Sequence, residues 1–304
     1  MSFSRGLVRE RAHVDEATST LVRVTPAGQA TRYRLAAGPR GLLRAAPSLK
    51  PGLTSLAEYE GPLMSQVGPT CQGHRVAQGL WIASAAAGNP LPWMPSPEGI
   101  WRDAGIFERV PHPDGTLPPI SNDGRTTSDV IRALATCGVR PIKATPSPSG
   151  YTDVDEATLT REPRLDELEQ EALTLITGEY ALDLSDWVEA WATMQALLGQ
   201  GFPLWVDLFV DTPLEVWGAE WTPSTPPVNQ IDKSDPKGGG HALLLNELLV
   251  GTDGSITPSL LNWWGPWGAP SLSGKGNQTG HLRMTGIGFA TSVYAVTVGK
   301  VVRT

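Results

Sequence analysis

The stretch QVGPTCQGHRVAQGLWIASAAAG, residues 66–88, decides how the rest of the sequence is interpreted. Val76 and Leu80 follow helical spacing, and Gly88 with the Asn and Pro after it stops the pattern. The sequence therefore predicts a helix that begins at Cys71. A thiol at a helix N-terminus lies near the positive end of the helix dipole, which favours the thiolate over the neutral thiol.

The other segments divide the sequence into a helical half and a strand-rich half. Helical patterns precede residue 203, and β-rich runs separated by Gly, Pro and Asp follow it. A surface loop is expected over 144–163, and helices over 99–110, 127–137, 165–176 and 185–198, the last capped by Ser185. Strands are expected in PLWVDLFV (203–210), HALLLNELLV (241–250), SLLNWW (259–264) and SVYAVTVGKVV (292–302). This order predicts an α+β fold with a helical N-terminal half, an antiparallel β-rich C-terminal half and a groove between them.

The composition is that of a soluble globular protein. The chain has 304 residues, of which 40% are hydrophobic and 18% charged, enough for one large domain or two smaller ones. No run approaches the roughly 18 apolar residues of a membrane span, and the first residues lack the order of a secretory signal. Cys71 and Cys137 could form at most one disulfide, which favours reduced thiols. A cytoplasmic or virion-associated protein without a membrane partner is expected.

The charge is distributed unevenly, and the first 50 residues form a basic arm. This arm carries nine Lys/Arg against three Asp/Glu, whereas the rest of the chain is acidic. Alternating patterns in Leu21–Val24 and Thr31–Leu35 predict a β-hairpin within it. The arm could dock on its own acidic body or on a protein partner, while its few aromatics and the lack of a recognised motif disfavour nucleic acid. The expected divisions are the basic arm (1–50) and a main domain (51–304). The main domain is expected to have a helical lobe over about 51–200 and a β lobe over about 201–304.

Three motif blocks hold four polar residues in order: Gln66 and Cys71 in QVGPTCQGH, His241 in GGGHALLL, and Asn262 in LLNWWGPWG. These blocks resemble the papain-like cysteine peptidases, particularly their divergent bacterial and viral branch. The resemblance extends over about residues 53–298, although only the three blocks are specific. It implies a papain-like two-lobed fold with the active-site cleft between the lobes.

The chemistry of thiol hydrolysis accounts for three of these residue types. Cys71 would be the nucleophile, because a helix N-terminus and an imidazolium partner lower a Cys pKa from about 8.5 by several units. His241 would accept the thiol proton and later return it to the leaving amine. Asn262 would accept a hydrogen bond from the other ring nitrogen and so fix the tautomer of the histidine.

Supporting roles are expected for further residues around these three. Gln66 could donate its side-chain N–H to the developing oxyanion, together with the backbone N–H of Cys71. Trp264 and Trp267 would lie over the His–Asn pair and exclude water from its hydrogen bond. Gly240, the last of three glycines before the histidine, leaves room for a substrate backbone.

Two features differ from the papain pattern and predict a reshaped site. Four residues separate Gln66 from Cys71, one fewer than in papain. Position 263 is Trp where the family usually has Ser, and the turn to the second Trp-Gly is also shorter by one residue.

The other polar candidates in the sequence are expected to have structural roles. His74 lies on the same helical face as Cys71 and competes with His241 as a base, although nothing in the sequence orients it. Cys137 is expected to pack in the core, and His281 is expected to be solvated because its neighbours are polar. No zinc or serine-hydrolase motif is present, so no metal and no organic cofactor is expected.

The leading interpretation is a papain-like thiol hydrolase, a cysteine peptidase that acts through a thioester of Cys71. Two alternatives stay open. One is a catalytically inactive papain-fold module that serves as a structural or binding part of a phage or another large assembly. The other is an endopeptidase or amidase that cuts cell-wall peptide with the same residues. The corresponding partners are a polypeptide or a peptidoglycan peptide.

Overall fold

The computed structural model describes residues 20–24, 30–34, 48–142, 176–285 and 290–298. The helices are α1 (Cys71–Ala86), α2 (Pro97–Glu108), α3 (Thr127–Cys137), α5 (Trp187–Gly199), α6 (Thr212–Ala219) and the short 3-10 helix η2 (Ala57–Tyr59). The strands are β1 (Thr20–Val24), β2 (Ala30–Arg34), β3 (Gly52–Ser55), β4 (Ile176–Ala181), β5 (Leu204–Val210), β6 (Gly239–Val250), β7 (Ile256–Leu261), β8 (His281–Arg283) and β9 (Ala290–Val298).

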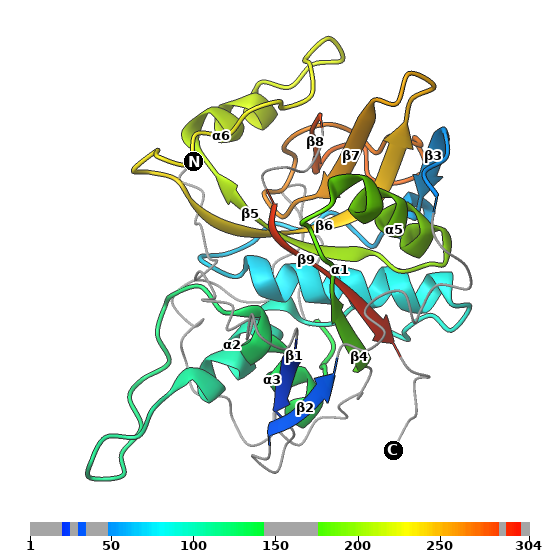
Figure 1. Ribbon diagram of the computed structural model, residues 1–304. Coiled ribbons are helices and arrows are strands. Elements are labelled where there is room, and N and C mark those ends of the chain that lie inside the picture. The colour runs from blue at the N-terminus through cyan, green and yellow to red at the C-terminus, as the bar shows by residue number, and fades with distance from the viewer. Residues whose placement is uncertain (1–19, 25–29, 35–47, 143–175, 286–289, 299–304) are drawn as a thin grey trace.

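One antiparallel sheet organises the molecule. Its strand order is β4-β9-β5-β6-β7-β8, and β3 pairs with the second half of β6. The long strand β6 pairs with β5 along its first half and with β7 along its second half. Helix α1 lies between this sheet and the helices α2 and α3 (Figure 1). The α+β arrangement predicted from the sequence is therefore confirmed.

Helix α1 is buried along most of its length because both of its sides are covered. Val76 and Leu80 are buried, as their spacing predicts. Two glycines allow close approach: a Cβ at Gly73 would lie 2.0 Å from the carbonyl oxygen of Pro97, and one at Gly79 would lie 2.7 Å from Nε1 of Trp205. The helix that begins at Cys71 is thus held rigidly against both neighbouring layers.

Side-chain caps set where the other helices begin. Ser96 accepts from the backbone N–H of Gly99 at the start of α2, and Thr126 caps α3. The expected cap of α5 was wrong by one residue: Asp186, not Ser185, accepts from the N–H groups of Val188 and Glu189, and the helix begins at Trp187. A carboxylate satisfies two of these donors at once, whereas a hydroxyl at the preceding position lies one residue too early.

Most strand predictions after residue 203 are confirmed, but two strands come from the earlier part of the chain. β3 pairs with β6, and β4 pairs with β9. β1 and β2 pair antiparallel in the segments where the sequence predicts a β-hairpin. The loop expected over 144–163 lies outside the described residues, as does the helix expected over 165–176 except for Ile176, which begins β4.

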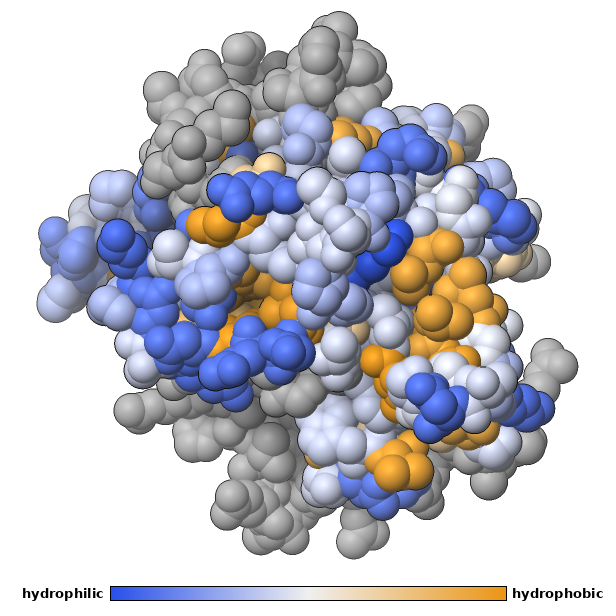
Figure 2. Space-filling view, turned by 90° about the horizontal axis from the view of Figure 1, so that it is seen from above, coloured by the Kyte–Doolittle hydropathy of each residue, from blue (hydrophilic) through white to orange (hydrophobic). Residues whose placement is uncertain are grey.

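The surface is mixed in character. Figure 2 shows separate hydrophobic areas within a largely hydrophilic face. Leu53 on β3 and Leu249 on β6 are exposed and lie directly opposite each other in the ladder, so they form one apolar spot. Scattered apolar residues of this kind are normal on soluble surfaces. Among the described residues, no helix combines the length and apolar character needed to cross a membrane.

Candidate active site

The three principal candidates lie at the ends of elements that the core holds in place. Cys71 is the first residue of α1, His241 lies near the start of β6, and Asn262 directly follows β7. Cys71 and His241 are both 0% exposed, and Cys71 is not part of a disulfide. Thr70 precedes the helix, but its hydroxyl donates to the carbonyl of Val67 and does not cap the first turn.

His241 and Asn262 are joined by a hydrogen bond that fixes the tautomer of the imidazole. His241 Nε2 lies 2.8 Å from Asn262 Oδ1, and the backbone N–H of Trp263 donates to the same oxygen at 2.8 Å. A backbone N–H can only donate, so the shared atom must be the amide oxygen, which can only accept. His241 Nε2 therefore carries a proton, and in the neutral ring Nδ1 is the basic nitrogen.

Aromatic rings cover this pair. The ring of Trp264 stacks on His241 with centroids 4.9 Å apart, and Trp267 meets Trp264 edge-on at 4.9 Å. Trp267 is held in turn by its Nε1, which donates to the carbonyl of Glu215 on α6. A Cβ at Gly218 would lie 1.8 Å from the Trp267 ring, so only glycine fits there. Helix α6, which the sequence analysis missed, thus supports the aromatic cover.

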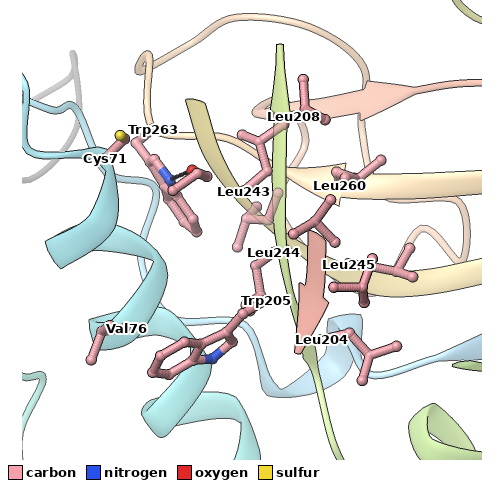
Figure 3. Packing of buried hydrophobic residues seen from close by; sticks show 14 of the residues in the cluster. Cys71, Val76, Leu204, Trp205, Leu208, Leu243, Leu244, Leu245, Leu260 and Trp263 are labelled. Atoms are coloured by element: carbon pink, nitrogen blue, oxygen red, sulfur yellow. Dashed lines mark hydrogen bonds between the residues drawn. The ribbon is translucent and has the colours of Figure 1, made fainter. Parts of the chain in front are cut away.

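Trp263 connects the thiol side of the site to the histidine side. Figure 3 shows Cys71 on the side of α1 that faces Trp263, and both belong to one buried cluster. Trp263 Nε1 donates to the carbonyl of Ala242, the residue after His241, at 2.8 Å. The position that differs from the papain pattern is therefore filled by a ring that bridges the two halves of the site.

His74 lies close by but is a poor candidate base. Its ring is 6.1 Å from Trp263, and its Nδ1 must donate to the carbonyl of Thr70, 3.1 Å away. Complete burial lowers the pKa of His74 to about 4, a hydrogen bond to the Thr70 backbone opposes this, and the charge of His241 lowers it further. With this pKa, His74 is neutral at pH 7, and its protonated form is strongly disfavoured.

Gln66 is tied to the same region through its backbone. Its N–H donates to the carbonyl of Trp263 at 2.6 Å, and Gly265 N–H donates to Met64 O at 3.0 Å. The side-chain Nε2 of Gln66, however, donates to the carbonyl of Gly68 at 3.0 Å. The loop before α1 is thus joined to the Asn262 turn, while the amide of Gln66 hydrogen-bonds within its own loop.

Gly240 and Cys137 complete the set of residues named from the sequence. Gly240 is half-buried in β6, opposite Phe209. Cys137 is the last residue of α3, and its side chain lies outside the described part of the structure. Within the described residues, no three His, Cys, Asp or Glu side chains come together as metal ligands.

The prediction for His281 was wrong. This residue is 0% exposed, with Nε2 3.2 Å from Glu60 Oε1 and Nδ1 2.9 Å from Ser259 Oγ. Glu247 on β6 lies 3.9 Å from Nδ1. Polar neighbours in the sequence suggested water as the partner, but in the interior the ring hydrogen-bonds to Ser259 and lies near two carboxylates from distant segments instead.

The sequence analysis also missed a buried ion pair between Arg75 of α1 and Asp207 of β5. Thr127 at the start of α3 and Gln72 also contact this pair. In sequence, an Arg on a helix and an Asp in a strand carry no sign of such a contact, because only the packing of α1 on the sheet brings them together.

Sequence comparison identifies no relative: no protein-family model and no curated protein matches the chain. Solved structures do match. Xylellain, a cysteine protease from Xylella fastidiosa, has 16% identity and a TM-score of 0.52 over 84% of this chain and 92% of its own. Procathepsin B S9 from Trypanosoma congolense has 13% identity and a TM-score of 0.56 over 97% and 87%. The bromelain protease from Ananas comosus has 13% identity and a TM-score of 0.50 over 82% and 100%. At such low identity the likeness concerns the architecture, and on that ground the chain has the α+β fold of the papain-like cysteine proteases.

Proposed function

We propose that this chain is a papain-like thiol hydrolase, a cysteine peptidase in which Cys71 is the nucleophile and His241 the general base. The observation that carries the proposal is the bond from His241 Nε2 to Asn262 Oδ1, with the amide oxygen identified by the Trp263 N–H. This arrangement leaves Nδ1 as the basic nitrogen, which is the atom that takes the proton of Cys71 in the proposed reaction. The thiol of Cys71, at the N-terminus of α1 and not part of a disulfide, supplies the nucleophile.

The reaction follows from these positions. His241 Nδ1 takes the proton of Cys71, and the sulfur attacks the scissile carbonyl carbon. When the C–N bond breaks, the imidazolium returns the proton to the leaving amine, and a thioester of Cys71 remains. A water molecule then gives a proton to Nδ1 and attacks the thioester carbonyl. Cleavage of the C–S bond releases the acid and restores the thiol.

The oxyanion that forms in both steps needs hydrogen-bond donors. The backbone N–H of Cys71 is the first, since it lies at the start of the helix. Gln66 is the second, and to act it has to turn its amide away from the Gly68 carbonyl. We expect substrate binding to bring about this turn. Loss of one such donor lowers the rate by about 100- to 1,000-fold, which is the expected effect of Gln66→Ala.

Alkylation of the thiol at pH 6 tests the proposal. A thiolate reacts with iodoacetamide at this pH, whereas an ordinary thiol is almost fully protonated. We expect mass spectrometry to find Cys71 labelled rapidly in the wild type and slowly in His241→Ala, with Cys71→Ser as the control for labelling elsewhere. A peptidyl epoxide should label the same residue.

Two observations favour a second candidate, an inactive papain-fold module of a larger assembly. Cys71 is 0% exposed, and the amide of Gln66 is held by its own loop. In that case Cys71 would stay unlabelled in the folded protein at pH 6 and react only after unfolding. The two candidates therefore give opposite results in the same experiment.

The substrate and the role of the basic arm need separate assays. Hydrolysis of casein indicates a polypeptide substrate, and clearing of purified peptidoglycan indicates a cell-wall peptide. Deletion of residues 1–50 should raise the labelling rate if the arm docks over the site. It should leave that rate unchanged but abolish assembly if the arm binds a protein partner, as in a virion.

A further inference from the structure

A buried polar bridge lies one helical turn beyond Cys71. Arg75 is 0% exposed and makes an ion pair with Asp207, which is itself buried. Its other contacts are with Gln72 Oε1 and with Thr127 Oγ1, the latter at 2.9 Å. The guanidinium carbon lies 5.0 Å from the centre of the Trp205 ring. Thr127 Oγ1 also lies 3.3 Å from Asp207 Oδ2, so the group forms a closed network.

This network joins the elements that carry the reacting groups. Arg75 lies on α1, which begins with Cys71, and Asp207 lies on β5. In the β5–β6 ladder, Asp207 is the direct partner of Ala242, the residue that follows His241. Arg75 is therefore four residues along α1 from Cys71, and Asp207 is one ladder position from the backbone of His241.

A buried ion pair of this kind needs a reason beyond stability. Removing two charges from water costs several kcal/mol each, and well-packed apolar residues of similar volume often stabilise a fold as well or better. Hydrogen bonds are directional, whereas apolar contacts are not. A planar guanidinium with several fixed partners therefore resists sliding and rotation of α1 over β5. In a site that depends on geometry, this resistance matters.

We propose that Arg75 and Asp207 are positioning residues for acyl transfer, because their ion pair fixes the helix that carries Cys71 relative to the strand that carries His241. The inference rests on the proposed function and deepens it. Neither residue touches the reacting atoms. Both act through the placement of α1 on the sheet, with Thr127 holding the pair in its orientation.

The test replaces the pair by apolar residues of similar size, in the double variant Arg75→Met/Asp207→Leu. The matched control is Arg140→Met/Asp103→Leu, which removes a buried ion pair with an N–O distance of 2.9 Å that does not involve α1 or the sheet. For each variant, the melting temperature by circular dichroism and the rate of Cys71 alkylation from pH 4 to pH 9 are measured in the full chain.

We expect the variant at Arg75 and Asp207 to fold but to react between about 10- and 100-fold more slowly at pH 6, since small displacements of reacting groups have effects of this size. The rise of its reaction rate with pH should move to higher pH, because a displaced imidazole stabilises the thiolate less. The control should keep the wild-type pH profile. A folded Arg75→Met/Asp207→Leu protein with the wild-type profile overturns the inference.

Milder variants keep the test decisive if the double variant does not fold. Thr127→Val removes the hydroxyl that contacts both Arg75 and Asp207, with almost no change in volume, and Arg75→Lys keeps the charge but loses the planar fork. Both should shift the profile in the same direction by a smaller amount, and unchanged profiles overturn the inference. Slow labelling of the wild type, independent of His241, removes the proposed function itself, whereas a reactive wild type with unaffected variants removes this inference alone.

Discussion

Two buried histidines lie on strands of the same sheet, and their surroundings are opposite in kind. His241 on β6 is held by a neutral amide and covered by the Trp264 ring. His281 on β8 lies between the carboxylates of Glu60 and Glu247. Both are 0% exposed, so burial does not distinguish them. The comparison teaches that the partner differs where burial does not: an amide fixes the tautomer of the His241 imidazole, whereas carboxylates make His281 part of a buried polar cluster.

The largest expected effect concerns the two histidines directly. His241→Ala should slow the alkylation of Cys71 at pH 6 by about 100- to 10,000-fold, the usual contribution of a positioned base. His281→Gln should leave the alkylation rate of the folded protein unchanged, although it lowers stability. An equal loss of reactivity in folded His281→Gln would remove the distinction between the two sites.

The next effect concerns the stability of the cluster at His281. Glu247 accepts hydrogen bonds from Leu272 N, Ser273 N and Ser55 Oγ, at 2.6, 2.9 and 2.9 Å. Glu247→Ala leaves these three donors without their acceptor and removes a carboxylate 3.9 Å from His281 Nδ1. We expect urea denaturation to show a loss of about 3 to 5 kcal/mol. Glu220→Ala on the exposed end of α6 is the control and should change little.

The same carboxylate should make the stability of the protein depend on pH in the acid range. Burial raises the pKa of Glu247, but the hydrogen bonds from Leu272 and Ser273 and the charge of His281 outweigh it, so the pKa in the folded protein is lowered from 4.5. A lowered folded pKa stabilises the protein above the unfolded value, and this stability is lost as the pH falls below about 4.5. In Glu247→Gln the unfolding free energy should change less with pH in that range. An unchanged pH dependence would show that Glu247 is not its cause.

His74 predicts a pH effect in a different window. Its folded pKa of about 4 lies below the ordinary histidine pKa of 6.5, so the unfolded chain takes up a proton first as the pH falls. Stability should therefore decrease from pH 6.5 towards pH 4, by about 3 kcal/mol in total. His74→Phe should remove this dependence of the unfolding free energy on pH. The groups that face His74, namely Glu98, His241 and the Thr70 carbonyl, are unchanged in this variant. Retention of the slope in His74→Phe would assign it to other groups.

The smallest expected effect concerns the aromatic cover of the His241 site. Trp264→Phe keeps an aromatic face over the imidazole but weakens the contact with Trp267. We expect the free energy of unfolding to fall by about 1 kcal/mol, in line with other aromatic pairs, and the alkylation rate to change little. A loss as large as that of His241→Ala would show that the cover itself governs the base.

The sequence predicted those parts of the fold that depend on local signals. Helix α1 has both a regular apolar pattern and a Gly-Asn-Pro stop, and it was predicted within two residues of its observed end at Ala86. The cap of α5 was not, because Ser185 and Asp186 are both good caps and local preference does not separate neighbours. Strands β3 and β4 were missed because their partners, β6 and β9, lie far along the chain.

The same limit applies to the sites. Cys71, His241 and Asn262 could be named as candidates because short motifs surround them, whereas Arg75 and Asp207 carry no local motif and meet only after α1 packs on β5. The direction of the Gln66 amide and the burial of His281 are likewise set by distant segments. Sequence patterns identify which residues are candidates, but tertiary packing decides which polar groups share an interior.

The position of β9 has a consequence for protein synthesis. This strand lies between β4 and β5, so a nascent chain that still ends before Ala290 leaves one edge of β5 open. Such a chain already contains Cys71, His241 and Asn262, yet the sheet that supports them is incomplete. Exposed strand edges pair readily with other chains. Ribosomes that stall before Ala290 would release an aggregation-prone product, because β5 gains its second neighbour only when β9 has emerged.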